Sequence, residues 1–195
     1  MDTRESLYDI LGFHSIPNLG KYLGFPIKHR GANNEDLNFV LERVKQKLTG
    51  WKTNLLSLAG RAVLIQVSTT TIPAYVMQCT ALPKKLLENI DRVNRNFLWG
   101  SMDDAKKFHW VGWHKVTKPK AERDLGIQSA KGRNQALLAK LNWRFRLGKD
   151  ALWVKVLNSK YCSNRRLNVK NCDRLSCSRT WKAMKMGSEV FNKVI

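Results

Sequence analysis

The chain has 195 residues, 43% of them hydrophobic, which is enough for one ordinary domain or two small ones. Its 35 basic residues outnumber 15 acidic ones, for a formal net charge of +20. No segment approaches about 18 uninterrupted apolar residues and the charged N-terminus lacks a signal-peptide pattern, so the sequence predicts neither a membrane span nor export. The four cysteines have no framework spacing, so we expect reduced thiols in an intracellular protein.

The positive charge is concentrated towards the C-terminus. Residues 105–195 contain 22 Lys and Arg against 5 Asp and Glu, a net of +17. Such a field attracts polyanions, because neutralised phosphates release their counterions. We therefore expect nucleic acid as the partner, with a basic protein that has no such partner as the alternative. A membrane surface is disfavoured, because no predicted helix pairs a clean basic face with a broad apolar one.

The N-terminal part predicts short strands and then a helix. Residues 1–31 mix aromatic and aliphatic residues with Gly and Pro, which indicates one or two short strands, too few for an independent sheet. A helix is predicted from Asn34, capped by Asn33 or Asn34 and ending near Gly50. Its apolar face has helical spacing and comprises Leu37, Leu41, Val44, Leu48 and Trp51.

Two further helices follow. Ser57 is the predicted N-cap of a helix that passes through Val63, Leu64 and Val67 towards Thr71, where Pro73 should kink or end it. Tyr75–Met77 can resume as helix. Pro83 is expected at the first position of the next helix, which ends at Gly100 and turns one face inward: Leu86, Ile90, Val93 and Phe97.

The basic part begins with an aromatic segment. Residues 108–128 are predicted to form a strand or extended arm, and 129–147 a helix that ends at Gly148, with these residues inward: Ala136, Leu137, Leu141 and Phe145. Asp150 should cap another helix, whose apolar residues are Leu152, Trp153, Val156, Leu157 and Tyr161. Residues 162–180 are predicted as a loop, and a last amphipathic piece starts near Trp181. The fold class predicted is therefore mainly α.

Candidate catalytic and metal-binding residues are weak. Asp103 and Asp104 follow Met102 as in a polymerase metal-binding turn, but the hydrophobic strands that such a turn needs are missing, so a solvated turn is favoured. His109 and His114 have no cysteine nearby, which disfavours a metal pair. No phosphate loop or nucleophile elbow occurs. The sequence predicts no enzyme active site, no metal site and no cofactor.

Basic residues interleaved with aromatic ones are the candidate nucleic-acid contacts, since aromatic rings stack on bases while cations meet phosphates. The first cluster contains Trp110, Trp113, His114, Lys115, Lys118 and Lys120, and the second contains Lys140, Trp143, Arg144 and Arg146. The alternative is that the tryptophans belong to the core and only the cations are exposed. We favour the core for Trp143 and Trp153, and both alternatives stay open for Trp110 and Trp113.

A succession of motifs extends over about residues 10–195. In order they are Tyr22–Ile27, Leu48 with Trp51–Lys52, Leu56–Arg61, Ile72–Gln78, Leu82–Pro83, Ile90–Asp91, Phe97–Gly100, Trp110–Trp113, Pro119–Lys120, Leu125–Ile127, Asn134–Lys140, Trp143–Arg144 and Lys160–Cys162. This succession resembles plant non-LTR (LINE-type) retrotransposon reverse transcriptases. One departure is Arg123–Asp124, where the family usually has Gly-Gly, which indicates either drift after loss of selection or an altered turn.

The resemblance implies a region after the polymerase palm. Residues 1–31 would be the remnant of the palm edge, 32–104 a helical thumb-like domain, and 105–195 a basic connector towards the zinc-binding and RNase H-like segments. The catalytic aspartates would precede residue 1 and the zinc-binding cluster would follow residue 195. The thumb would grip a template–primer duplex of RNA or DNA, in the nucleus. Arg61 would meet a phosphate there, and an intramolecular or surface salt bridge is its alternative.

Three hypotheses follow. The first is a truncated reverse transcriptase fragment: a nucleic-acid-binding thumb and connector without a polymerase active site. The second is a non-functional retrotransposon-derived remnant that folds poorly alone. The third and weakest is an enzyme that acts with a separately encoded palm.

Overall fold

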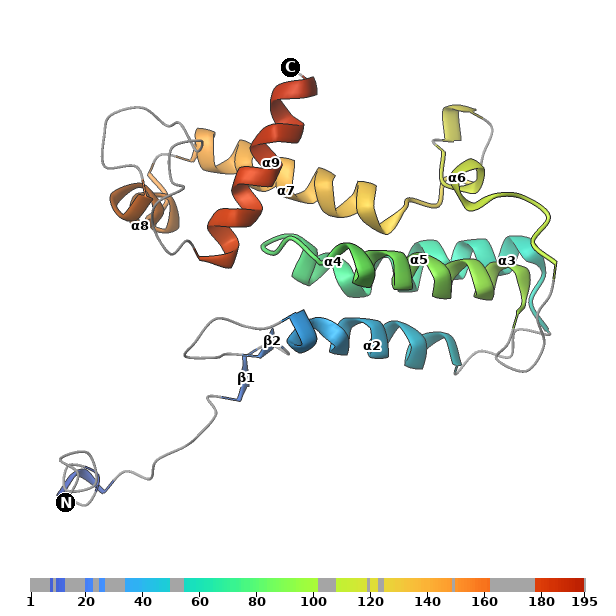
Figure 1. Ribbon diagram of the computed structural model, residues 1–195, viewed down its shortest axis with the longest axis horizontal. Coiled ribbons are helices and arrows are strands. Elements are labelled where there is room, and N and C mark those ends of the chain that lie inside the picture. The colour runs from blue at the N-terminus through green and yellow to red at the C-terminus, as the bar shows by residue number, and fades with distance from the viewer. Residues whose placement is uncertain are drawn as a thin grey trace. The chain divides into compact units, whose positions relative to one another are not determined.

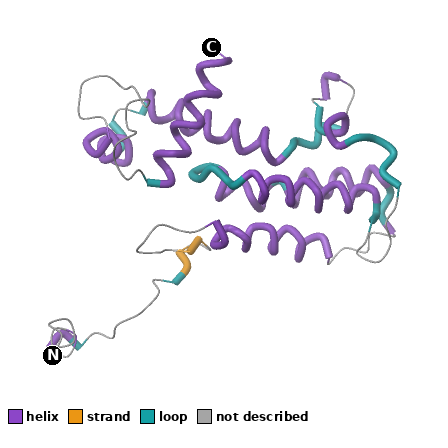
Figure 2. The backbone as a smooth tube through the Cα atoms, in the orientation of Figure 1, coloured by secondary structure: helices purple, strands orange, loops and turns teal. Residues whose placement is uncertain are grey.

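The computed structural model describes most of the chain and divides it into two compact units, Met1–Asp36 and Leu37–Ile195. The described residues are 8, 10–12, 20–22, 25–26, 34–49, 55–101, 108–118, 120–122, 125–148, 150–161 and 178–194. They are mainly helical, which confirms the predicted fold class (Figures 1 and 2). None of the described helices combines the length and the apolar character needed to cross a membrane.

The first unit contains a small antiparallel hairpin. Strand β1 (Lys21–Tyr22) pairs with β2 (Phe25–Pro26), with Lys21 opposite Pro26 and Tyr22 opposite Phe25. The short N-terminal strands predicted from sequence are therefore confirmed.

The helices after the hairpin occur in an order close to the predicted one. They are η1 (Asn34–Leu37, 3₁₀), α2 (Asn38–Thr49), α3 (Leu58–Leu64), η3 (Ile65–Thr69, π), α4 (Thr71–Met77), α5 (Lys84–Trp99), α6 (Trp113–Val116), η4 (Lys120–Glu122, 3₁₀), α7 (Ala130–Leu147), α8 (Leu152–Tyr161) and α9 (Arg179–Val194). Residues 108–128 are predicted to form a strand or an extended arm, and the strand alternative is wrong: the described residues there form loops, α6 and η4. Four residues of helix at Trp113–Val116 let Trp113 and Val116 reach the core from one turn.

Helix α2 turns a slightly different face inward than predicted. Val40, Val44 and Leu48 are buried, together with Leu37, whereas Leu41 is only half-buried. Leu37 ends the preceding 3₁₀ turn, and its spacing of three residues from Val40 in α2 places both on the same side. Three residues predicted for this helix lie outside the described residues: the candidate N-cap Asn33, the terminating Gly50 and the inward Trp51.

The predicted cap of α3 is confirmed, but the expected break at Pro73 is displaced. The Ser57 hydroxyl accepts a hydrogen bond from the Gly60 amide at 3.2 Å, the geometry of an N-cap. The irregularity comes earlier than the proline, in the π-helical turn η3 (Ile65–Thr69). Pro73 is the third residue of α4, where a missing amide removes no hydrogen bond within that helix.

Threonine side chains accompany the wide turn. The Thr69 hydroxyl donates to the Ile65 carbonyl and the Thr71 hydroxyl to the Val67 carbonyl, each at 2.9 Å, and Thr70 bonds the Gln66 carbonyl in the same way. Hydroxyls bonded back to the preceding turn bend helices, so three successive threonines favour an irregular turn here.

Helix α5 begins and ends close to the predicted residues. Pro83 is its N-cap, one position before the predicted place, and Gly100 ends it with a left-handed φ of 69°. The predicted inward residues Leu86, Ile90 and Phe97 are buried.

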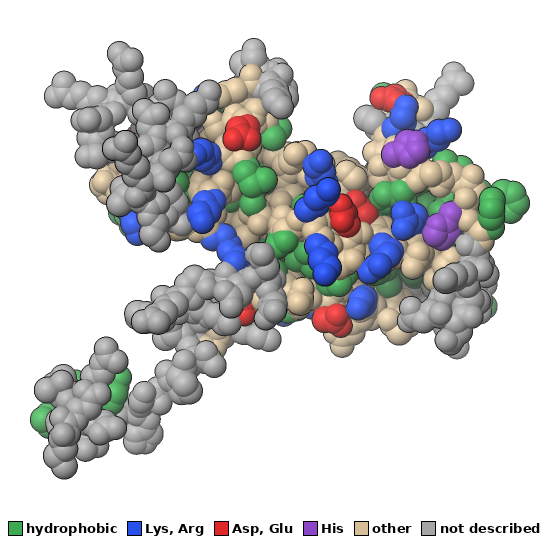
Figure 3. All heavy atoms as spheres, viewed as in Figure 1, with side chains coloured by type: hydrophobic (Ala, Val, Ile, Leu, Met, Phe, Trp, Pro, Cys, Tyr) green, Lys and Arg blue, Asp and Glu red, His purple; other side chains and the backbone are tan. Residues whose placement is uncertain are grey.

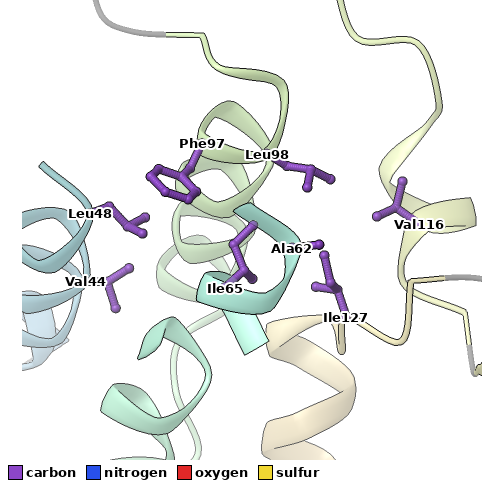
Figure 4. Packing of buried hydrophobic residues seen from close by; sticks show 8 residues of the cluster. All are labelled: Val44, Leu48, Ala62, Ile65, Phe97, Leu98, Val116 and Ile127. Atoms are coloured by element: carbon purple, nitrogen blue, oxygen red, sulfur yellow. The ribbon is translucent and has the colours of Figure 1, made fainter. Parts of the chain in front are cut away.

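The first hydrophobic cluster joins several helices of the second unit. Figure 4 shows its buried members converging from α2, α3, η3, α5 and α6 with the segment before α7. They are Val44, Leu48, Ala62, Ile65, Phe97, Leu98, Val116 and Ile127. Trp113 packs against this cluster while remaining half-buried.

The second cluster is formed by α7, α8 and α9. Its buried members are Phe145, Val154, Tyr161, Trp181 and Met184, and the Tyr161 and Trp181 rings stack with centroids 4.6 Å apart. Helix α9 crosses α7 closely at Gly187, where a Cβ atom would overlap the carbonyl of Leu138 (Figure 1). Two of the apolar residues named for α8 from the sequence, Leu152 and Val156, are exposed. Val154 takes their place because α8 meets the cluster with only one side.

Polar residues connect α7 to the preceding helices. The buried Asn134 side chain donates to the carbonyls of Met77 and Thr80 and accepts from the Leu82 amide, and the Ala130 amide donates to Asp91 at 2.9 Å. The predicted inward residue Ala136 is exposed instead. The inward face of α7 contains polar residues that an apolar pattern does not detect: it comprises Ala130, Asn134, Leu138, Asn142 and Phe145.

Candidate nucleic-acid interface

The second predicted cluster is brought together on the solvent side of α7. Lys140, Trp143 and Arg144 are all exposed, and their spacing of three and four residues places them on one face of the helix. We call these three residues the α7 stripe. It presents two cations and one indole to solvent within about one helical turn.

The exposure of Trp143 contradicts its predicted burial. Its side chain is 46% exposed, and its ring lies 5.4 Å from that of Phe191 in α9. The Phe191 ring therefore covers only part of the indole. Trp153, in contrast, packs half-buried against the second cluster as predicted.

Arg146 is directed towards α9 and not along the α7 stripe. Its Nη2 lies 3.3 Å from both Ser188 Oγ and Asn192 Oδ1, and its guanidinium lies 4.7 Å from the Phe191 ring centroid. These contacts use donors and a face that a phosphate would otherwise engage. The structure therefore separates Arg146 from Lys140 and Arg144.

The first predicted cluster is divided by the fold. Trp110 is 77% exposed and forms an edge contact with Phe108, at 5.6 Å between ring centroids, whereas Trp113 packs on the first hydrophobic cluster. Lys115 is exposed on α6, and Lys118 forms a 2.8 Å salt bridge with Glu122. The side chain of Lys120 lies outside the described residues.

Arg61 lies at the C-terminal end of α5. Its Nη1 donates to the Leu98 carbonyl at 3.4 Å, and its guanidinium occupies the space that a side chain at position 100 would need, which the glycine leaves open. A cation at this end of a helix interacts favourably with its carbonyls and dipole. The contact of Arg61 with phosphate stays a prediction. In the structure its guanidinium binds the C-terminal end of α5.

Sequence reasoning missed the outer face of α5. Arg92 and Arg95 line a cavity of about 330 Å³ that also involves Trp113 from α6. Figure 3 shows Lys and Arg side chains gathered over α5 and the neighbouring part of α7. The spacing of residues 88, 92 and 95 on the solvent side of a predicted helix was the available signal.

Asp91, in the wall of this cavity, has a perturbed acidity. Burial raises the pKa of its carboxyl group, although the Ala130 amide, the Trp113 side chain and the nearby Arg95 each favour the ionised form. The Asp91 carboxyl group thus lies at a desolvated position, where it accepts a hydrogen bond from the first backbone amide of α7.

The described residues contain no group of three His, Cys, Asp or Glu arranged to hold a metal ion. His109 lies 3.4 Å from Ser101 Oγ and stacks near Trp99, and His114 is exposed on α6. The paired aspartates lie outside the described residues, as do the departure from the family pattern and three of the four cysteines: Asp103, Asp104, Arg123, Asp124, Cys162, Cys172 and Cys177.

Comparison with known proteins found similarity to two proteins of Arabidopsis thaliana. The first, named provisionally as a ribonuclease H protein, is 36% identical over 167 residues, which cover 83% of this chain and 26% of that protein. The second, an uncharacterized mitochondrial protein, is 34% identical over 91 residues, which cover 46% of this chain and 59% of that protein. The chain thus spans about a quarter of one relative and under two thirds of the other. No protein-family model and no solved structure matches it.

Proposed function

We propose that this chain is a nucleic-acid-binding piece of a LINE-type reverse transcriptase, equivalent to the thumb and connector, without a polymerase centre of its own. The observation that carries the proposal is the α7 stripe, where cations and an exposed indole share one helix face in the most basic part of the chain. The similarity to a plant protein named provisionally for ribonuclease H supports it, because the family resemblance places the connector before an RNase H-like segment. A nuclear location follows from that resemblance alone.

The mechanism is binding directed at the backbone of the nucleic acid. Lys140 and Arg144 would neutralise phosphates one helical turn apart, and Trp143 would stack on an exposed base or sugar. Such contacts position a duplex without reading its sequence. The chemistry of synthesis would be supplied by carboxylates outside this piece.

The salt dependence of affinity tests this proposal. The full chain should bind a labelled RNA–DNA duplex with an affinity that falls steeply with salt, measured by fluorescence anisotropy. The double variant Lys140→Gln/Arg144→Gln should bind more weakly and reduce the slope of log K against log salt by about 2, since each phosphate contact contributes about 0.9. Trp143→Ala should weaken binding with the slope unchanged, because it removes stacking and no charge.

The control is Lys45→Gln/Lys47→Gln on α2. It removes the same charge from exposed positions away from the α7 stripe, so it should change the slope by less than half as much. If both double variants changed the slope equally, binding would depend on the net charge of the chain and not on the α7 stripe. A flat salt response, or no binding at low salt, would contradict the proposal, and a non-cooperative melt would favour the remnant hypothesis.

A further inference from the structure

The cavity beside α5 has no role in the binding described above. It has a volume of about 330 Å³, at the lower end of the range of roughly 300–1,000 Å³ for small-ligand sites. It is lined by Glu88, Asn89, Asp91, Arg92, Arg95 and Trp113. Five of these residues come from two turns of α5 and one from the start of α6.

The arginines of the cavity form no salt bridge with any carboxylate in the part of the chain that the structure describes, although Arg95 lies near enough to Asp91 to favour its ionised form. Arg92 Nη2 donates to the neutral Asn89 Oδ1 at 2.9 Å. Their spacing of three residues places both on one side of the helix. Two guanidinium groups so placed match the planar, multidentate recognition of phosphate oxygens.

The carboxylates of the cavity are engaged by other partners. Glu88 lies 3.7 Å from the ammonium of Lys84, and Asp91 accepts the Ala130 amide. The Lys84 ammonium offsets the charge of Glu88, whereas Asp91 keeps its charge close to Arg95. When Lys84 is counted with the lining residues, three cations stand against two carboxylates, a net charge of +1 next to an aromatic ring.

From these contacts we propose that the cavity binds a single nucleotide, with its phosphate at Arg92 and Arg95 and its base against Trp113. The site is mononucleotide-sized and separate from the α7 stripe, which addresses the backbone of a duplex. Trp113 is fixed by the first hydrophobic cluster, so the aromatic wall is already in place before a ligand arrives. The nucleotide comes from one of two sources: an unpaired residue of a bound strand, which rests on the proposed function, or a free nucleoside monophosphate.

Two measurements separate these sources. Anisotropy compares an RNA–DNA duplex carrying one unpaired adenosine with the same duplex fully paired. NMR follows the Trp113 indole N–H, identified with Trp113→Phe, during titration with adenosine 5′-monophosphate. The wild-type chain should bind the bulged duplex about fivefold or more tightly than the paired one, the lower end of what base stacking provides.

The variants decide whether the cavity causes the preference. Arg92→Gln/Arg95→Gln should bring the affinity ratio close to one, whereas Lys45→Gln/Lys47→Gln should keep it. Arg92→Gln alone, at an exposed position, should reduce the ratio even if the double variant is unstable.

Each outcome has a defined meaning. A ratio of one in the wild type with no indole shift overturns the proposal, as does a preference that survives Arg92→Gln. An indole shift without a preference for the bulge assigns the cavity to free nucleotide. If neither duplex binds, the proposed function fails. The titration with adenosine 5′-monophosphate then shows by itself whether the cavity binds a nucleotide.

Discussion

Replacement of Asn134 by alanine should strongly destabilise the second unit. The side chain is 3% exposed and makes three hydrogen bonds, to Met77 O and Thr80 O at 3.1 Å and from the Leu82 amide at 3.0 Å. Each such bond contributes about 0.5–1.5 kcal/mol, and its loss leaves a buried backbone group unsatisfied. The expected decrease in the free energy of unfolding is about 3 kcal/mol, which corresponds to a decrease in Tm of about 6–12 °C.

Urea denaturation followed by circular dichroism measures this loss, with Gln135→Ala as the matched control. Gln135 follows Asn134 in α7, is half-buried and takes no part in the network, so its variant should lie within about 0.5 kcal/mol of the wild type. A loss below about 1 kcal/mol for Asn134→Ala would refute the reasoning, because it would mean that the three backbone groups find other partners.

Three further predictions concern the packing and acidity of the same unit. Gly187→Ala should destabilise by about 1–3 kcal/mol in urea because its Cβ would overlap the Leu138 carbonyl, whereas Gly60→Ala, with Cβ contacts of 3.6 Å, should be neutral or stabilising. Ser57→Ala should cost about 1 kcal/mol by removing the cap of α3, and an unchanged urea midpoint would contradict the cap. Because the folded chain holds the Asp91 proton more tightly than the unfolded chain, whose pKa is near 3.8, wild-type stability should fall as pH rises from there through the raised folded pKa. Urea titrations at stepped pH should show this fall to be smaller in Asp91→Asn, and parallel curves would exclude a raised pKa.

The helices that could be predicted are those with local start and stop signals. Ser57 and Gly100 each meet a local backbone requirement, a hydroxyl acceptor and a left-handed φ, so their positions follow from short-range chemistry. The π-helical turn could not be predicted in this way. The threonine hydroxyls bind backbone carbonyls of the preceding turn and so compete with ordinary α-helical geometry. Whether an α turn or a π turn forms then depends on how both flanking helices pack.

The inward face of α7 was predicted poorly because two of its buried residues are polar. Asn134 and Asn142 have no hydrophobic signal, and their burial depends on carbonyls supplied by distant parts of the chain, such as Met184 O for Asn142. The same reason applies to the candidate site. Helical spacing predicts that Lys140 and Arg144 share a face, but nothing local indicates that Arg95 and Trp113 share a cavity.

The π-helical turn at Ile65–Thr69 has a consequence for the length of related chains. A π turn accommodates one residue more than an α turn, so the extra residue is absorbed locally and the helices on both sides keep their orientation. A relative one residue shorter at this point can therefore present α3 and α4 on an unbroken helix without moving Ala62 or Val76 from the interior. An alignment gap inside this apparently continuous helical stretch is thus compatible with a preserved fold, and residues 65–69 are the place to expect it.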